Sequence, residues 1–202
     1  MGVSERREQE RHERTQRILE AALRVFAREG LRPATIEAIA GEAQLGKGTI
    51  YYYFSSKEAL LEELVANLSD EYFRGLLAGA SGHATPLAIA QGIVERLIEH
   101  YRGKPELFRV IHMVLGEPEP RPQKALEAFV DSHLSWIENL KDETAEVLQA
   151  HGVPEDAFLY LVSTFSHGVL FEAVSGRDPD RLLNETRVAL EAFLASFSGT
   201  TS

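Results

Sequence analysis

Residues 46–57 concentrate side chains that can bind phosphate or the edges of bases. The run GKGTIYYYFSSK contains two lysines, Lys47 and Lys57, the hydroxyl of Thr49, and three consecutive tyrosines at positions 51–53. Ammonium and hydroxyl groups contact phosphates in protein–DNA complexes, and polar side chains on a helix can reach base edges. On a helix the three tyrosines span about 200° of arc, so at least one must be exposed. The alternative is that Tyr51 or Tyr53 packs against a neighbouring helix, with only its hydroxyl reaching water.

Two short helices and a tight turn are expected to carry these residues. Thr35 can cap a helix over 35–42, and Gln44-Leu45-Gly46 makes a turn into a second helix over 46–53. Ile50 and Phe54 are spaced four apart and are expected to point inward. A preceding amphipathic helix over 15–29 ends at Gly30, and the three helices together match helix-turn-helix geometry, with 46–53 as the recognition helix.

The sequence of this segment resembles the TetR family of bacterial transcription regulators. The resemblance lies in Gly48-Thr49-Ile50-Tyr51-Tyr52-Tyr53-Phe54, followed by Ser56-Lys57-Glu58-Ala59-Leu60, and it covers about the first quarter of the chain. The chain departs from the family at Gly46, where a hydroxyl cap is common, and at Gln44, where glycine is common and a left-handed residue is costlier. The resemblance implies DNA contacts by Thr35, Tyr53 and Lys57 at phosphates, and by Lys47, Gly48, Thr49, Tyr51 and Tyr52 at the groove.

The charge distribution restricts DNA contact to one end of the chain. The whole chain has a net charge of −10, which argues against indiscriminate nucleic-acid binding. Residues 1–57 carry ten Lys or Arg against eight Asp or Glu, a net of +2, so that residues 58–202 carry −12. A mildly basic N-terminal segment followed by an acidic remainder of the chain is typical of a protein that binds DNA at one end.

Residues 1–14 are a run of arginine and glutamate with almost no apolar side chain. Such a run is a solvated helix or a disordered arm. In a DNA-binding head it can also reach the backbone or the minor groove, with Arg6, Arg7, Arg11 and Arg14 as candidates. Both readings stay open from the sequence.

The rest of the chain shows helical periodicity without strand alternation, which predicts an all-α fold. Ser55 and Glu58 form a capping box that opens a long helix through Leu76. GASGHATP at 79–86 is expected to be a linker. Further helices are expected over 87–101, 105–115, 123–150, 155–175 and 180–197. We therefore predict a helix-turn-helix DNA-binding domain with its N-terminal arm at 1–56 and a helical ligand-binding and dimerisation domain at 57–202.

The last two helices are apolar over more than one face. A helix that packs on one side needs a stripe of about 100°, and a wider stripe predicts a second partner. We expect a homodimer through helices of about 155–175 and 180–197, as a four-helix bundle. The alternative is that both helices are central in the monomer. The family resemblance also implies a homodimer built on these helices, whose two recognition helices require a pseudo-palindromic operator.

The middle helices supply material for a ligand pocket but no catalytic group. Aromatic rings combined with polar tips suit an apolar or amphipathic effector, with an acyl-type molecule as one candidate. Plain core packing is the alternative for each of these residues. The histidines lack metal-binding spacing, no nucleophile elbow occurs, and Gly41…Gly46-Lys47 lacks the hydroxyl residue of a P-loop, so we expect no enzyme, metal or cofactor. The pocket candidates are Tyr101, Phe108, His112, Met113, His133, Trp136, Phe165 and His167.

Together these features predict a ligand-responsive, homodimeric transcriptional repressor that binds double-stranded operator DNA. The chain has no run of 18 apolar residues and a charged N-terminus, so no membrane span or signal peptide is expected, and a cytoplasmic location follows. The alternative is an all-α small-molecule-binding or adaptor protein that does not act on DNA.

Overall fold

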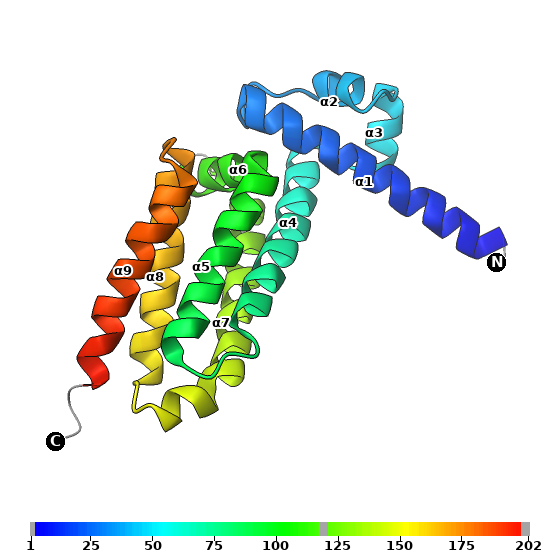
Figure 1. Cartoon of the computed structure of the whole chain (residues 1–202). Coiled ribbons are helices and arrows are strands. Elements are labelled where there is room, and N and C mark those ends of the chain that lie inside the picture. The colour runs from blue at the N-terminus through cyan, green and yellow to red at the C-terminus, as the bar shows by residue number, and fades with distance from the viewer. Residues whose placement is uncertain (1–2, 118–120, 199–202) are drawn as a thin grey trace. The chain divides into compact units, whose positions relative to one another are not determined.

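The computed structural model describes residues 3–117 and 121–198, and every regular element in these ranges is an α-helix. The all-α prediction is therefore confirmed. Figure 1 labels the helices in chain order. They are α1 (Val3–Glu29), α2 (Ile36–Glu42), α3 (Lys47–Tyr53), α4 (Lys57–Ala80), α5 (Pro86–Gly103), α6 (Pro105–Gly116), α7 (Gln123–Ala150), α8 (Glu155–Val174) and α9 (Pro179–Ser198).

The chain divides into two compact units. The first comprises Met1–Leu68 and Arg109–Phe129, and the second comprises Ser69–Phe108 and Val130–Ser202. The continuous helix α4 contributes Lys57–Leu68 to the first unit and Ser69–Ala80 to the second. The division of function at residue 56 stays a prediction.

The core of the first unit contains the apolar faces of α1, α2 and α3. Ile18, Val25 and Phe26 of α1 and Ile39 of α2 are fully buried, as is Ile50 of α3. Gly30 ends α1 in a left-handed conformation (φ 92°), which glycine adopts without the steric cost of a Cβ. The apolar side of the amphipathic helix predicted over 15–29 is thus the side of α1 that packs in the core of this unit.

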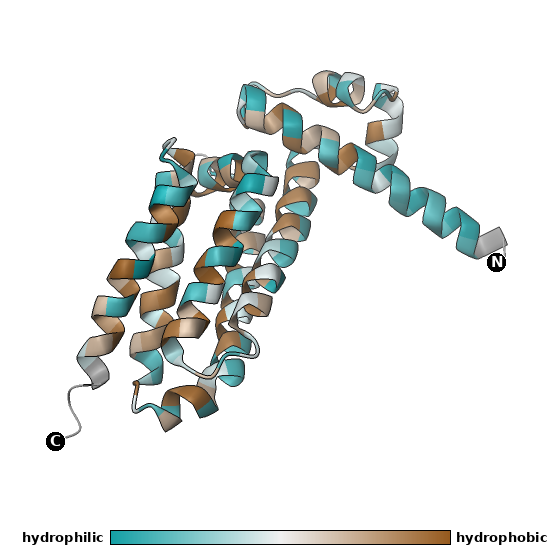
Figure 2. Ribbon diagram, in the orientation of Figure 1, coloured by the Kyte–Doolittle hydropathy of each residue, from teal (hydrophilic) through white to brown (hydrophobic). Residues whose placement is uncertain are grey.

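Helix α1 is much longer than the segment 15–29 expected from its apolar stripe. It begins at Val3, so that the arginine–glutamate run is helical and continuous with the packed part. Arg6 pairs with Glu10 at 3.1 Å, and the Gln9 amide donates to Glu13 at 3.1 Å, both one turn apart. Figure 2 shows this part of α1 as hydrophilic.

In the second unit, α5, α8 and α9 pack against one another. Figure 1 shows these three helices side by side. Gly79 of α4 and Gly92 of α5 bring two backbones together, since a Cβ on Gly92 would lie 2.1 Å from the Gly79 carbonyl oxygen. Gly79 lies inside α4, so the linker expected at 79–86 is wrong at its start. The loop begins after Ala80, and Thr85 caps α5 by accepting from the Ala88 amide at 3.2 Å.

Candidate nucleic-acid interface

The turn between α2 and α3 has the form expected of a helix-turn-helix. Thr35 is in the extended region and its hydroxyl accepts from the Ala38 amide at 3.1 Å, which confirms the predicted cap of α2. Gln44 adopts φ 56° in the turn, the costly left-handed conformation for a residue with a Cβ. Gly46 precedes α3 at its N-cap position without a side-chain bond.

Helix α3 has one buried side chain and an exposed face. Ile50 is completely buried and Phe54 is buried just beyond the helix, as predicted. Tyr51 is 47% exposed and Tyr52 is 77% exposed, whereas Tyr53 is half-buried and meets the Tyr52 ring edge-on at 5.2 Å. Lys47 and Gly48 are exposed and Thr49 is half-buried. The exposed side chains form a polar and aromatic surface on α3, a helix of seven residues.

Lys47 is positioned by two neighbours. Its ammonium pairs with the carboxylate of Glu37 on α2 and lies 5.7 Å from the centre of the Tyr51 ring. The hydrogen bond to Glu37 raises the pKa of Lys47 and lowers the pKa of Glu37. Lys47 therefore lies at the start of α3 as an exposed ammonium group whose charge is paired with Glu37.

Lys57 has a different environment from the one predicted. Its ammonium donates to three carbonyl oxygens beyond the end of α1, those of Leu31, Arg32 and Ala34, each at 2.9 Å. A lysine has three N–H donors, so all of them are in use. This geometry favours a structural role, in which Lys57 joins the start of α4 to the α1–α2 connection, over a phosphate contact. The cap of α4 also differs from the prediction, because Ser56 rather than Ser55 accepts from the Ala59 amide, at 3.0 Å.

In the second unit, aromatic rings form one connected network. Tyr101 and Phe108 meet at 5.4 Å between ring centres, Phe108 meets Tyr72 at 5.5 Å, and Tyr72 adjoins Phe73 at 4.9 Å. The Tyr101 hydroxyl donates to the Ala173 carbonyl at 2.8 Å. The network joins residues of α4, α5, α6 and α8.

The network continues through Phe73 into α7. Phe73 stacks on Trp136 at 5.6 Å and lies 5.5 Å from His133, whose ring is 5.3 Å from that of His167. Burial, with a smaller contribution from the charge of His167, lowers the pKa of His133. His133 is therefore neutral near pH 7, and its Nε2 lies 3.3 Å from the Ser163 hydroxyl.

The structure connects five of the eight predicted pocket residues through this network. Tyr101, Phe108, His133, Trp136 and His167 belong to it, although His167 is exposed. Phe165 is half-buried and has no ring contact with another described residue, and His112 and Met113 lie in the first unit. Tyr72 and Phe73, which join the two ends of the network, were not among the predicted pocket residues. The sequence pattern placed them only on a long helix.

Three buried polar atoms in the second unit lack a hydrogen-bond partner among the described residues. They are the hydroxyls of Ser69 and Ser166 and the indole Nε1 of Trp136. A buried donor without a partner costs about 1–3 kcal/mol, so each of these atoms is a candidate point of contact for a bound molecule. A hollow of about 190 Å³ in this unit is lined by Phe73 and Trp136 among others.

The described residues contain no group of three or more His, Cys, Asp or Glu that could hold a metal ion. One described helix, α8, is long and apolar enough to cross a membrane by length and composition alone. In this structure 44% of its apolar stretch is buried, and the core helix of a bundle passes the same test.

Helices α1, α2 and α3 have the arrangement of a helix-turn-helix domain. The sequence profile described as "Bacterial regulatory proteins, tetR family" matches residues 18–64, which cover α1 from Ile18 through α2 and α3 into α4. This match confirms that the N-terminal part of the chain resembles the TetR family.

Relatives with known names support this resemblance. The chain is 32% identical over 95 residues to the transcriptional repressor KstR2 of Mycobacterium tuberculosis, covering 46% of this chain and 48% of the relative. The chain thus spans about half the length of the first curated relatives it matches. Among solved structures it resembles the fatty acid degradation regulator FadR of Bacillus halodurans, with a TM-score of 0.73 and 16% identity over 87% of this chain and 93% of that one. It also resembles FadR of Bacillus subtilis in complex with stearoyl-CoA, with a TM-score of 0.68 and 17% identity over 87% and 96%.

Proposed function

We propose that this protein is a transcriptional repressor that binds a pseudo-palindromic operator as a homodimer and is released by an apolar or amphipathic small molecule. The observation that carries the proposal is the surface of α3. This helix buries only Ile50 and presents Tyr51, Tyr52 and the ammonium group of Lys47 to solvent. These groups suit phosphates and base edges in a major groove.

The proposed DNA contacts follow from the positions of the side chains. Lys47, Gly48, Thr49, Tyr51 and Tyr52 are assigned to the groove, and Thr35 and Tyr53 to flanking phosphates. Lys57 is assigned to holding α4 against the α1–α2 connection, because its donors are occupied. Acting on chromosomal DNA places the protein in the cytoplasm.

The proposed dimer uses α8 and α9. Apolar side chains on these helices face solvent in the monomer, including Tyr160, Phe171 and Val188. Tyr160 and Phe171 are eleven residues apart and therefore lie on the same side of α8. A second copy would cover this face in a four-helix bundle.

The proposed effector binds in the second unit, near the aromatic network. The rings offer apolar surface, and the free indole N–H of Trp136 is a donor for a carbonyl oxygen. The FadR structure with stearoyl-CoA supports an acyl-type molecule. Because α4 is continuous between the two units, a ligand that shifts it would act on Lys57 at its start. By linkage, DNA must weaken effector binding by the same factor as effector weakens DNA binding.

Fluorescence anisotropy of the purified chain with DNA upstream of its own gene tests the proposal. We expect binding that resists scrambled competitor DNA and that long-chain acyl-CoA reverses. Binding of acyl-CoA that DNA does not affect, with no preference for any DNA, would instead support a ligand-binding protein that does not act on DNA.

A further inference from the structure

The cations of the first unit differ in whether they have partners. Arg24 and Arg28 bind Glu42, with distances of 2.8 and 3.3 Å, and the resulting hydrogen bonds lower the pKa of that carboxyl group. Arg32 pairs with Glu117, Lys47 with Glu37, and Lys57 donates to three carbonyls. Each of these side chains has at least one partner within the protein, and Lys57 has all three of its donors in use.

Four arginines of α1 are exposed and have no hydrogen bond or ion pair to any described residue. They are Arg7, Arg11, Arg14 and Arg17. Their spacing of four, three and three residues places them along one side of a helix. This side of α1 is named here the arginine face.

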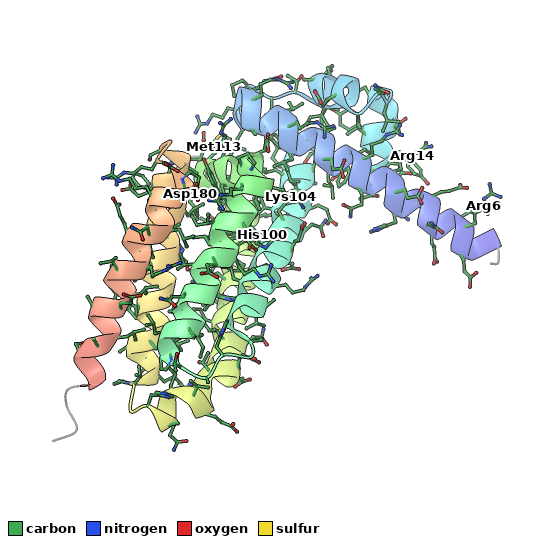
Figure 3. All side chains as sticks on the ribbon, in the orientation of Figure 1. Arg6, Arg14, His100, Lys104, Met113 and Asp180 are labelled. Carbon is green, nitrogen blue, oxygen red and sulfur yellow. The ribbon has the colours of Figure 1, made fainter. Side chains whose placement is uncertain are left out.

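The arginine face forms one wall of a concave surface that encloses a volume of about 500 Å³. Tyr52 and Tyr53, at the end of α3, line the same surface. Figure 3 labels Arg14 at the part of α1 near α3 and Arg6 closer to the N-terminus. The arginine face is therefore continuous with the exposed surface of the recognition helix.

Two acidic residues also line the concave surface. Glu10 is paired with Arg6, and Glu13 accepts from the Gln9 amide. Four arginines thus face two carboxylates, of which one is already paired with a cation outside the surface. A surplus of positive charge therefore lies beside α3, and it suits a polyanion bound there.

We propose that the arginine face binds the phosphate backbone of DNA immediately beside the bases that α3 reads. The proposal rests on the function proposed above and extends its footprint. Ten residues of helix between Arg7 and Arg17 span about 15 Å, at 1.5 Å per residue. Successive phosphates on one strand advance by about 3.4 Å along the duplex axis, so the face matches about four base pairs.

Helix formation explains why these contacts need no folding step on binding. Residues 3–14 already continue the packed helix α1, so the guanidinium groups are carried on a preformed rod. Preorganisation reduces the entropy lost on binding. A disordered arm with the same composition would lack this advantage.

The test replaces all four residues of the arginine face with glutamine in the full chain. Arginine and glutamine have similar helix propensities, and circular dichroism checks that α1 persists. Arg6→Gln is the control, because Arg6 is on the same helix and does not line the concave surface, although its partner Glu10 does. A second variant, with lysine at the four positions, keeps the charge.

Operator affinity is measured from 50 to 200 mM salt, together with a hydroxyl-radical footprint. Each lost phosphate contact reduces the salt slope by about 0.9, so one contact per protomer reduces it by about two in a dimer. We expect a reduction of at least this size for the glutamine variant and loss of protection at the outer edges of the footprint. The Arg6→Gln and lysine variants should retain most of the native slope.

An unchanged slope and footprint in the glutamine variant, with operator binding intact, would overturn this inference alone. A native chain that binds no DNA selectively would overturn the proposed function and this extension with it.

Discussion

Tyr52 is the most exposed aromatic side chain of the first unit, at 77%, and it is central to the proposed recognition of sequence. We predict that Tyr52→Ala lowers the preference for operator over scrambled DNA by about tenfold, which corresponds to about 1.4 kcal/mol. The loss arises because the ring and hydroxyl no longer contact the groove. Competition anisotropy measures it. Tyr52→Phe separates the hydroxyl from the ring, and an unchanged preference in both variants would remove Tyr52 from the interface.

Lys57 is expected to affect stability rather than DNA binding. We predict that Lys57→Gln lowers the free energy of unfolding by about 2 kcal/mol, since hydrogen bonds to a charged group contribute about 1.5–3 kcal/mol. The salt slope of DNA binding should stay the same. Thermal unfolding and a salt series measure the two effects. Lys47→Gln serves as control, because an exposed ion pair changes stability by less than about 1 kcal/mol. A reduced slope with unchanged stability would restore the phosphate contact implied by the family resemblance.

These two residues show what the sequence could and could not predict. The three consecutive tyrosines predicted that at least one of them is exposed, but not that Tyr52 is the most exposed. The cap by Thr35 followed from its place before an apolar stripe. The partners of Lys57 are carbonyls some 23–26 residues earlier in the chain, which no local pattern reveals. The cap of α4 is Ser56 and not the predicted Ser55, which reflects the usual uncertainty of one residue at helix ends.

At the scale of elements, the crossing of α4 and α5 depends on two glycines. We predict that Gly92→Ala destabilises the protein by about 1–3 kcal/mol, because the new methyl group would overlap the backbone of Gly79. Gly41→Ala is the control, since nothing lies within 4 Å of a Cβ there and alanine favours a helix by up to about 1 kcal/mol. Chemical denaturation measures both variants. Equal stability of the two variants would show that the helices do not cross this closely.

Helix α1 shows why element boundaries were only partly predictable. The apolar stripe identifies the buried part of α1, Ile18 to Phe26. A helix extends beyond its buried part, however, wherever the neighbouring residues favour the helical conformation. The run before it consists of good helix formers with pairs such as Arg6–Glu10, so it extends α1 without a stripe. The reverse occurred at Gly79, where glycine indicated a linker but serves close packing inside a helix.

For the whole molecule, the proposed function requires two copies of the chain. We predict that Val188→Glu on α9 shifts the protein to monomer, because it places a charge in an apolar interface. Leu134→Glu on α7 is the matched control, since Leu134 is 55% exposed and Val188 is 59% exposed. Sedimentation velocity distinguishes the species. A dimer that tolerates Val188→Glu but is lost with Leu134→Glu would move the interface to α7.

The central claim is sequence-specific recognition of DNA by α3, and selection of genomic fragments tests it most directly. The purified native chain and a Lys47→Ala/Tyr52→Ala double variant would each select fragments from genomic DNA at near-physiological salt, followed by sequencing. We predict that the native chain enriches a small set of fragments that share a pseudo-palindrome, and that the variant does not. No enrichment by the native chain, or equal enrichment by the variant, would contradict the claim.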